Sequence, residues 1–303
     1  MENSLSIVIT TYNRPKMLKR CLASILNQNY SNYEIIVVDD HSKPSYQDEI
    51  MMEYSNVKYF YQNRNEGPGA ARNRGIKEAI NKYVVIMDDD DIFVNESFIA
   101  INNFLLNNKD LKYPVFNFLS SNTIVKYKKY YHVYSFSEMI SDFIIGDVIH
   151  LIRKDLFDGY YLFPTTKIGS ESLLWYQIAI DFGFPIINNS IVQVMGDSPE
   201  RLTNTNRQVE HANLFAEYQI DIITKFSKEI LASNNEKFLV KKYVGAITYL
   251  LLSTQKKKAL YYLGEILRIS KKYIALITLF FIPNKVLIKL FNLYRKNNEK
   301  ESV

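Results

Sequence analysis

The sequence predicts an α/β protein with a mostly parallel central sheet and helices on its faces. In the first third of the chain, short apolar runs alternate with stretches of helical periodicity. The runs are almost entirely apolar, as in strands that are covered on both faces. Several of them end in polar clusters, and parallel sheets place ligands beyond the carboxyl ends of their strands. Strands and helices that alternate in this way are joined by right-handed crossovers.

The elements of this first part follow in order from their patterns. The predicted strands are Leu5–Thr10 (LSIVIT), Glu34–Val38 (EIIVV), Val57–Tyr61 (VKYFY) and Tyr83–Met87 (YVVIM). The predicted helices are Pro15–Asn27, Tyr46–Tyr54 and Ala70–Asn81. Pro15 suits the first turn of a helix, where its missing N–H leaves no hydrogen bond unmade.

The rest of the chain is less regular at first and then helical. The sequence predicts strands at Val115–Leu119 and Thr123–Tyr127, and helices at Glu171–Phe182, Glu210–Phe226 and Glu236–Leu252. We therefore expect an α/β domain over residues 1–208, with halves of about 1–110 and 111–208, and a helical region over 209–303.

Basic residues are concentrated in the last part of the chain. From Lys237 to the end there are 14 Lys/Arg and 3 Asp/Glu, whereas the whole chain has a net charge of only +5. The body of the protein is therefore net acidic. Apolar residues are interleaved with the basic ones, which favours an anionic membrane surface as partner over nucleic acid. We expect a membrane-associating region here and no nucleic-acid partner.

The segment Tyr273–Phe291 is apolar over most of its length but is interrupted by Pro283, Asn284 and two lysines. A membrane-spanning helix needs about 20 nearly unbroken apolar residues. The pattern favours an interfacial or re-entrant helical pair. A spanning helix and an ordinary buried helix are the alternatives.

The expected location is cytoplasmic, peripheral at the inner face of the cell membrane. Cys21 is the single cysteine, so an intrachain disulfide is excluded, which fits a reducing compartment. The first residues lack the basic stretch and apolar run that are typical of a secretory signal.

Four consecutive aspartates, Asp88–Asp91, follow the fourth predicted strand. Four adjacent carboxylates repel one another, so this cluster is costly unless a positive group binds there. A hard divalent cation such as Mg²⁺ or Mn²⁺ would offset the repulsion and could bridge to phosphate. The alternative is an acidic loop that caps the next helix.

Five segments in order resemble motifs of a known family. They are Ser6–Asn13 (SIVITTYN), Ser24–Gln28 (SILNQ), Glu34–Ser42 (EIIVVDDHS), Asn65–Gly75 (NEGPGAARNRG) and Met87–Asp91 (MDDDD). Together they resemble the catalytic domain of family 2 glycosyltransferases, which have the GT-A fold. The resemblance covers residues 4 to 185, and the tail matches no family that we can name.

The resemblance implies a nucleotide-sugar site. Thr10, Tyr12 and Asp40 would hold the base, Tyr12 by stacking and Asp40 by accepting a hydrogen bond from a ring N–H. Arg72, near the start of a helix, would meet the nucleotide or its pyrophosphate. His41 stands where the family usually has glycine, which we interpret as a tolerated loop substitution.

Asp88-Asp89-Asp90 matches the DxD element of the family, which binds metal and ribose. Asp88 and Asp89 are therefore expected donor-binding residues. Asp90 is the expected ligand of Mn²⁺ or Mg²⁺, and Asp91 would lie behind it or cap the next helix.

An inverting transferase needs one carboxylate to take the proton of the acceptor hydroxyl. Family members usually place this base in a Glu-Asp pair at a helix start, but here Ser172 stands in the Asp position. Glu171 keeps the only carboxylate and is the expected catalytic base. The alternatives are a helix-capping role for Glu171, and Asp197 as the base.

Other polar and aromatic residues have two interpretations each. Trp175 and Tyr176 could stack on a sugar ring or belong to the core. Arg201 and Arg207 could close over the pyrophosphate as a lid or could be surface residues.

The resemblance predicts an inverting, metal-dependent glycosyltransferase of surface polysaccharide synthesis, such as that of capsule or O-antigen. Its donor would be a nucleotide sugar, with UDP expected and dTDP or GDP as alternatives, and its acceptor a glycan or lipid-linked saccharide. Two other functions stay open: a non-catalytic partner subunit that binds nucleotide sugar, and a sugar nucleotidyltransferase. A homo-oligomer is compatible with the sequence.

Overall fold

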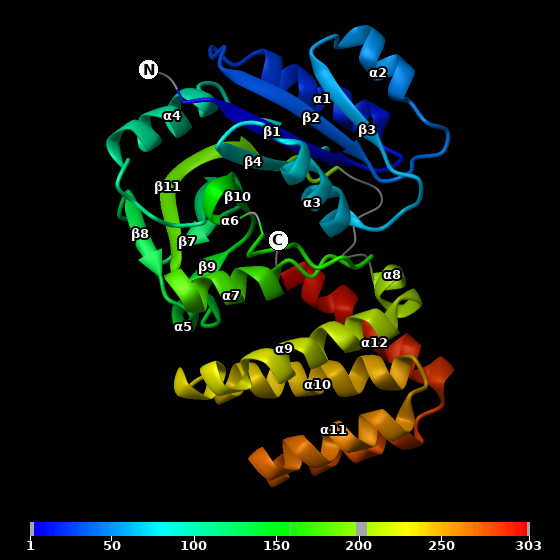
Figure 1. Ribbon diagram of the computed structural model, residues 1–303. Helices are drawn as coiled ribbons and strands as arrows, with labels where there is room; N and C mark the ends of the chain where they lie inside the picture. Colours follow the sequence, from blue (N-terminus) through cyan, green and yellow to red (C-terminus); the bar gives the residue numbers. More distant parts are fainter. Residues whose placement is uncertain (1–2, 158, 198–204, 302–303) are drawn as a thin grey trace. The chain divides into compact units, whose positions relative to one another are not determined.

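The computed structural model describes residues 3–157, 159–197 and 205–301 (Figure 1). The chain forms two compact units, residues 1–198 and 199–303. The first unit contains the sheet, and the second is helical. The domain boundary expected near residue 208 falls inside the short helix α8 (Thr205–Glu210).

Four parallel strands form one half of a nine-stranded sheet, in the order β3-β2-β1-β4. They are β1 (Leu5–Thr11), β2 (Tyr33–Asp39), β3 (Val57–Tyr61) and β4 (Tyr83–Asp88). The sequence predicted all four strands to within a residue at each end. Every residue of β1 is buried, as expected of a central strand with both faces covered.

Three helices connect these strands: α1 (Pro15–Leu26), α2 (Gln47–Glu53) and α3 (Pro68–Glu78). Helix α1 buries Leu18, Cys21, Leu22 and Ile25, a stripe with the spacing of one helix face. Helix α3 begins two residues before the predicted start. It lies close to β1 because Gly75 has no side chain: a Cβ there would be 2.2 Å from Cγ1 of Val8.

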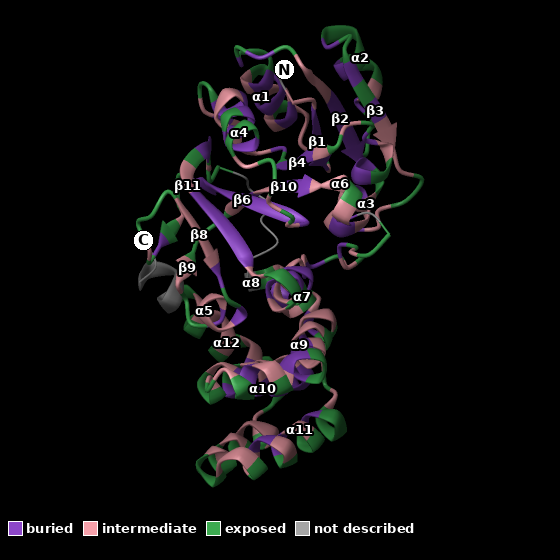
Figure 2. Cartoon of the chain, turned by 60° about the vertical axis from the view of Figure 1, so that its left-hand side comes forward, coloured by how far each residue is buried: buried purple, intermediate pink, exposed green. Residues whose placement is uncertain are grey.

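The other half of the sheet makes the whole sheet mixed. Strand β10 (Val148–Arg153) is antiparallel to both β4 and β6 (Val115–Ser120), and β11 (Phe184–Gln193) is parallel to β6. The short strands β5 (Ile92–Phe93) and β8 (Tyr131–Tyr134) pair with β11. In Figure 2 the strands of the sheet are mostly in the colour of buried residues.

The predicted strand Thr123–Tyr127 is mostly loop. Only Ile124–Val125 (β7) pairs, with Ile144–Ile145 (β9), in a separate two-stranded sheet. The remaining helices of the first unit are α4 (Ser97–Asn107), α5 (Phe136–Met139), α6 (Lys154–Phe157) and α7 (Ser172–Phe182). Helix α4 completes the core with Phe98 and Phe104, which contact aromatic rings of the sheet edge to face.

The second unit consists of helices. After α8 come α9 (Ala212–Ala232), α10 (Glu236–Leu252), α11 (Lys256–Ile269), the 3₁₀ helix η1 (Lys271–Phe281) and α12 (Asn284–Glu301). Helix α10 packs against α9 and α11. In the described part of the chain, no helix combines the length and the apolar character that crossing a membrane requires.

Candidate active site

The carboxyl ends of β1, β2 and β4 bring together the polar clusters that the sequence places after them. Thr10 is the register partner of Asp88 across the β1–β4 pair, and the backbone N–H of Asp40 donates to the carbonyl oxygen of Thr11 at 2.9 Å. Thr10 and Asp40 are buried, whereas Tyr12 is partly exposed. These three expected base-binding residues therefore lie along one edge of the sheet.

Asp40 organises the loop that leads into α3. Its carboxylate accepts hydrogen bonds from Nε2 of Gln62 at 2.6 Å and from the backbone N–H groups of Glu66 and Gly67, both at 2.8 Å. Burial raises the pKa of Asp40, and the two backbone donors work against this rise. Asp40 thus has a structural role in addition to the one expected at a nucleotide base.

Arg72 of α3 joins two expected site residues. One guanidinium nitrogen donates to the carboxylate of Asp88 at 2.8 Å, and another donates to Oε1 of Glu171. The Arg72 side chain is only 11% exposed, and it lies over the ring of Phe163, 5.6 Å from its centroid. An expected phosphate-binding cation, an expected donor-binding carboxylate and the expected base therefore form one cluster.

The segment that carries Glu171 is fixed against the start of α3. The Asn73 side chain both donates to the backbone carbonyl of Phe163 and accepts from its N–H, each at 2.9 Å. Gly69 permits this close approach, because a Cβ there would lie 2.0 Å from the carbonyl oxygen of Pro164. Glu171 directly precedes α7, the helix that the chain enters after this segment.

Trp175 belongs to the core, which is one of the two interpretations that its sequence position allows. It is buried, and it stacks on His150 of β10 with ring centroids 3.8 Å apart. Tyr176 packs edge to face against Phe136. Burial, with a contribution from the charge of Arg72, lowers the pKa of His150 to about 3, so this imidazole is neutral at physiological pH.

Two arginines outside the expected site residues, Arg14 and Arg20, balance the negative charge of the aspartate cluster. Arg14 binds Asp89 at 2.6 Å and Asp90 at 2.9 Å. Arg20 of α1 donates to the backbone carbonyl of Asp90 at 2.5 Å and forms two hydrogen bonds with Asp197. Four adjacent carboxylates require nearby cations, and this charge balance could have directed attention to both arginines.

The members of the cluster differ in their surroundings. Asp89 is fully buried, and burial raises its pKa to about 7 although Arg14 and Thr11 work against the rise. Burial also raises the pKa of Asp91 to about 6. The backbone N–H of Met195 donates to this carboxylate and works against the rise. Asp88 has the opposite shift: the charge of Arg72 outweighs the effect of burial and lowers its pKa.

The donor set suits a divalent cation that also binds phosphate. In the described part of the chain, no three His, Cys, Asp or Glu residues are placed to hold a metal by themselves. The carboxylates of Asp88 and Asp90 are both partly exposed. One or two carboxylates supplemented by substrate phosphates and water is the usual environment of Mg²⁺. The residues therefore fit a cation that arrives with a diphosphate.

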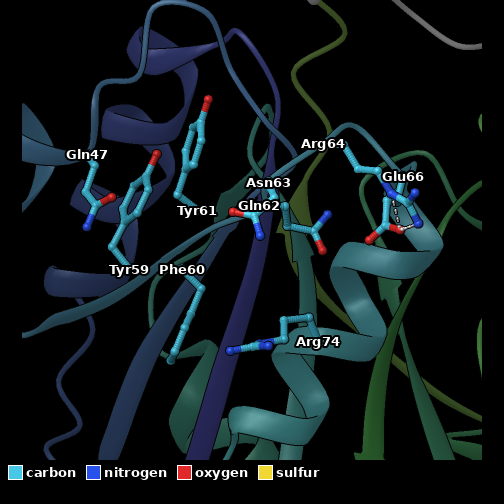
Figure 3. A pocket seen from close by; sticks show the side chains of 9 residues that line it. All are labelled: Gln47, Tyr59, Phe60, Tyr61, Gln62, Asn63, Arg64, Glu66 and Arg74. Carbon is cyan, nitrogen blue, oxygen red and sulfur yellow. Dashed lines mark hydrogen bonds and ion pairs between the residues drawn. The ribbon is translucent and has the colours of Figure 1, made fainter.

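A pocket of about 800 Å³ lies along the edge strand β3 (Figure 3). Its wall includes Gln62 and Glu66, which also contact Asp40, so the pocket borders the expected base site. Arg74 lies over the ring of Phe60 and pairs with Glu78 at 2.9 Å. The sequence pattern does not predict this pocket.

Neither expected lid residue lies among the described residues of the first unit. Arg201 lies outside the described residues, and Arg207 is in α8 of the second unit. His41 has a left-handed backbone with φ of 72°, which explains why glycine suits this position, and its Nδ1 lies 3.0 Å from the carbonyl oxygen of Gln62. The substitution is thus accommodated within the loop.

Several glycosyltransferases are similar to this chain in sequence. An uncharacterized glycosyltransferase of Rickettsia conorii is 25% identical over 85% of this chain, and the match spans 42% of that relative's length. The glucosyltransferase WfgD of Escherichia coli, named as acting from UDP-Glc on α-D-GlcNAc-diphosphoundecaprenol, is 25% identical over 61% of this chain and 73% of its own. A Campylobacter jejuni β-1,3-glucosyltransferase named for an undecaprenol-diphosphate saccharide is 36% identical over 29% of each chain.

Solved structures show the same fold. Residues 1–349 of Staphylococcus aureus TarS, crystallised with UDP-GlcNAc, superpose with a TM-score of 0.57 at 17% identity over 81% of each chain. The mannosyltransferase PcManGT of Pyrobaculum calidifontis, crystallised with GDP-Man and Mn²⁺, has a TM-score of 0.55 at 17% identity over 98% of this chain and 88% of its own. The fold is therefore GT-A. The family model of glycosyl transferase family 2 matches residues 6–159, half of the chain, and the protein belongs to this family.

Proposed function

We propose that this protein transfers a sugar from a UDP-sugar, with inversion, to a lipid-linked acceptor in surface polysaccharide synthesis. The observation that carries the proposal is the cluster of Arg72, Asp88 and Glu171 at the carboxyl ends of the parallel strands. The printed names of WfgD and the Campylobacter enzyme support an undecaprenyl diphosphate acceptor. Such an acceptor is a lipid, so the proposed place of action is the inner face of the cell membrane.

In this proposal, Tyr12 stacks on the nucleotide base, and Thr10 and Asp40 line its edge. Arg72 is the cation for the diphosphate, since it lies near the N-terminus of α3, where an anion is also favoured. Asp90, with Asp88, would hold Mn²⁺ or Mg²⁺, and this ion would supply Lewis-acid stabilisation of the leaving diphosphate. Asp89 is buried between Arg14 and Thr11 and holds the loop rather than the donor.

Glu171 is the proposed base. It takes the proton of the acceptor hydroxyl while the acceptor oxygen forms a bond to the anomeric carbon and the nucleoside diphosphate leaves. In this structure the Glu171 carboxylate is paired with Arg72. A donor diphosphate competes for the same guanidinium, so donor binding releases Glu171 for proton transfer. Because Ser172 stands where family members usually have Asp, Glu171 is the one carboxylate of this pair that can accept the proton.

The test is release of nucleoside diphosphate from a panel of UDP-, GDP- and dTDP-sugars, with Mn²⁺ or Mg²⁺ and with EDTA. A polyprenyl-diphosphate saccharide serves as acceptor. We expect turnover of one UDP-sugar that requires metal and is lost in Asp90→Ala. Asp110→Ala, at an exposed position of the same unit, is the control and should retain activity.

Other outcomes select the alternatives. Metal-dependent donor binding without turnover of any acceptor would indicate a non-catalytic partner subunit, which the serine at position 172 favours. Formation of nucleotide sugar from a sugar phosphate and a nucleoside triphosphate would indicate a nucleotidyltransferase.

A further inference from the structure

Helix η1 is an apolar segment that packs against α11 with only half-buried side chains. None of its eleven residues is buried, although most of them are apolar. Ile274 is 52% exposed and Phe281 is 82% exposed. Runs of 3₁₀ helix longer than three or four residues are uncommon, and this run has no buried side chain to stabilise it. An apolar segment exposed to water in this way is unfavourable unless another surface covers it.

Helix α12 continues this apolar surface. Val286, Leu290, Leu293 and Tyr294 are all exposed, and their spacing puts them on one helix face. Leu287, which is buried, turns another face of the helix toward the protein. Three exposed lysines flank the exposed stripe on one side by the same helical spacing: Lys285, Lys289 and Lys296.

The charge around this surface has a single sign. From Ile266 to Asn298 the chain has seven Lys/Arg and no Asp/Glu. Three further lysines, Lys256–Lys258, begin α11, and Nζ of Lys256 donates to the carbonyl oxygen of Phe280 at 2.9 Å. This hydrogen bond brings the lysine triplet to the end of η1 where Phe281 is exposed, while Lys271 and Lys272 lie at its other end.

This distribution of positive charge distinguishes between two possible partners of the apolar surface, a second copy of the chain and a lipid bilayer. A second copy of the chain would bring seven positive charges against seven more, which disfavours self-association through this face. An anionic bilayer complements the charge, accepts the apolar side chains, and lets lysines extend to the headgroups. Since neither η1 nor α12 has the length and apolar character to cross a membrane, both would lie in its plane.

We propose that η1 and the exposed stripe of α12 dock on an anionic lipid bilayer, with Ile274, Ile277 and Phe281 entering the boundary between headgroups and acyl chains. The lysines at both ends of η1 contact the headgroups. This docking deepens the proposed function, on which it rests in one respect: a lipid-linked acceptor requires the enzyme to work at a bilayer.

The experiment is flotation of the full chain with vesicles of phosphatidylcholine alone, or of phosphatidylcholine mixed with phosphatidylglycerol, at low and high salt. We expect binding to the anionic vesicles that weakens with salt. The variant Ile277→Asn/Phe281→Ser should bind at least about tenfold more weakly, since two apolar side chains no longer enter the interface. Its control is Met52→Ser/Ile80→Asn, which removes two exposed apolar side chains from the first unit and should bind like the parent.

A second pair of variants tests the charge. Lys271→Glu/Lys272→Glu should also bind about tenfold more weakly to anionic vesicles, while Lys109→Glu/Lys112→Glu, at exposed positions of the first unit, should have a smaller effect. Both pairs change the net charge of the chain equally. The charge variant also substitutes for the apolar one if the latter does not fold.

Three results would overturn the proposal: no binding of the parent to anionic vesicles, equal binding of the η1 variants and their controls, or a parent dimer in analytical ultracentrifugation that these variants dissociate. A separate measurement distinguishes failure of the docking proposal from failure of the proposed function. It is the release of nucleoside diphosphate from the donor alone, without vesicles. The η1 variants should keep that hydrolysis, whereas Asp90→Ala should lose it and still float with vesicles.

Discussion

Arg72 donates to Glu171 across 99 residues of sequence and so connects the phosphate side of the candidate site with its expected base. The same guanidinium holds Asp88. Because Arg72 is nearly buried, its charge needs these two carboxylates whenever no phosphate is bound. In the proposed mechanism, the state of Glu171 therefore depends on whether the donor is present.

The first prediction concerns Glu171→Gln. The amide oxygen of Gln can still accept from Arg72, so donor binding should stay close to that of the parent. The amide cannot accept the hydroxyl proton, so kcat should fall by a factor of about 10² to 10⁴. Steady-state kinetics and donor titration measure the two effects separately.

Glu78→Gln is the matched control for this variant. Glu78 has the same 28% side-chain exposure as Glu171 and is also paired with an arginine, Arg74, but on the outer face of α3. It should retain full activity. If Glu171→Gln loses donor binding and keeps its kcat, Glu171 positions Arg72 and is not the base.

The second prediction concerns Gly69→Ala. The Cβ of the new alanine would lie 2.0 Å from the backbone carbonyl oxygen of Pro164. A backbone carbonyl cannot turn aside as a side chain can, so α3 and the segment before Glu171 must move apart. We expect a loss of about 1–3 kcal/mol in the free energy of unfolding, together with lower activity. Gly264→Ala in α11 meets nothing within 4 Å and should instead stabilise by about 0.5–1 kcal/mol. Urea unfolding compares them, and equal effects of the two substitutions would argue against this packing.

The sequence predicted the parallel half of the sheet because each of its strands is a local apolar run. It did not predict β11, in which Asn188, Asn189 and Ser190 interrupt the apolar pattern at the point where the pairing with β6 shifts register. A strand of this kind is recognisable only once its neighbours are in place. Helix α4 was also missed, although its buried residues follow a helical period.

The candidate site shows the same limit. The motifs identified Arg72 and the aspartates, since they lie within short segments. The pairing of Arg14 with Asp89 and Asp90 joins residues about 75 positions apart, and nothing local in the sequence indicates it. Whether Trp175 faces a ligand or the core likewise depends on β10, which places His150 against its ring.

The third prediction concerns Cys21. Its thiol is fully buried on the inner face of α1, and burial raises its pKa well above the ordinary value. The thiolate is the form that attacks a thiol reagent, so native protein should react with Ellman's reagent only as fast as the fold opens. The labelling rate should rise with urea in step with unfolding. Rapid labelling in native buffer, at the rate of the urea-unfolded chain, would show that α1 is not packed as described.

The fourth prediction is a pH dependence of stability that originates at Asp89. Burial raises its pKa to about 7, against about 3.9 in an unfolded chain. Between these values the folded protein binds a proton that the unfolded chain has lost, so the contribution of this carboxyl to stability falls as pH rises. The slope is at most about 1.4 kcal/mol per pH unit. Asp89→Asn stays neutral and should lose this part of the pH dependence.

Urea unfolding in EDTA at several pH values between 4 and 8 measures this difference. The stability of Asp89→Asn relative to the parent should increase up to about pH 7 and then level off. Asp88→Asn is the control with the opposite sign, because Arg72 outweighs burial and lowers the pKa of Asp88. That variant should be less stable than the parent at neutral pH, with a deficit that disappears as pH falls through the pKa of the carboxyl. If both differences have the same sign, then Arg14 and Arg72 do not distinguish the two aspartates, and the electrostatic account of the cluster fails.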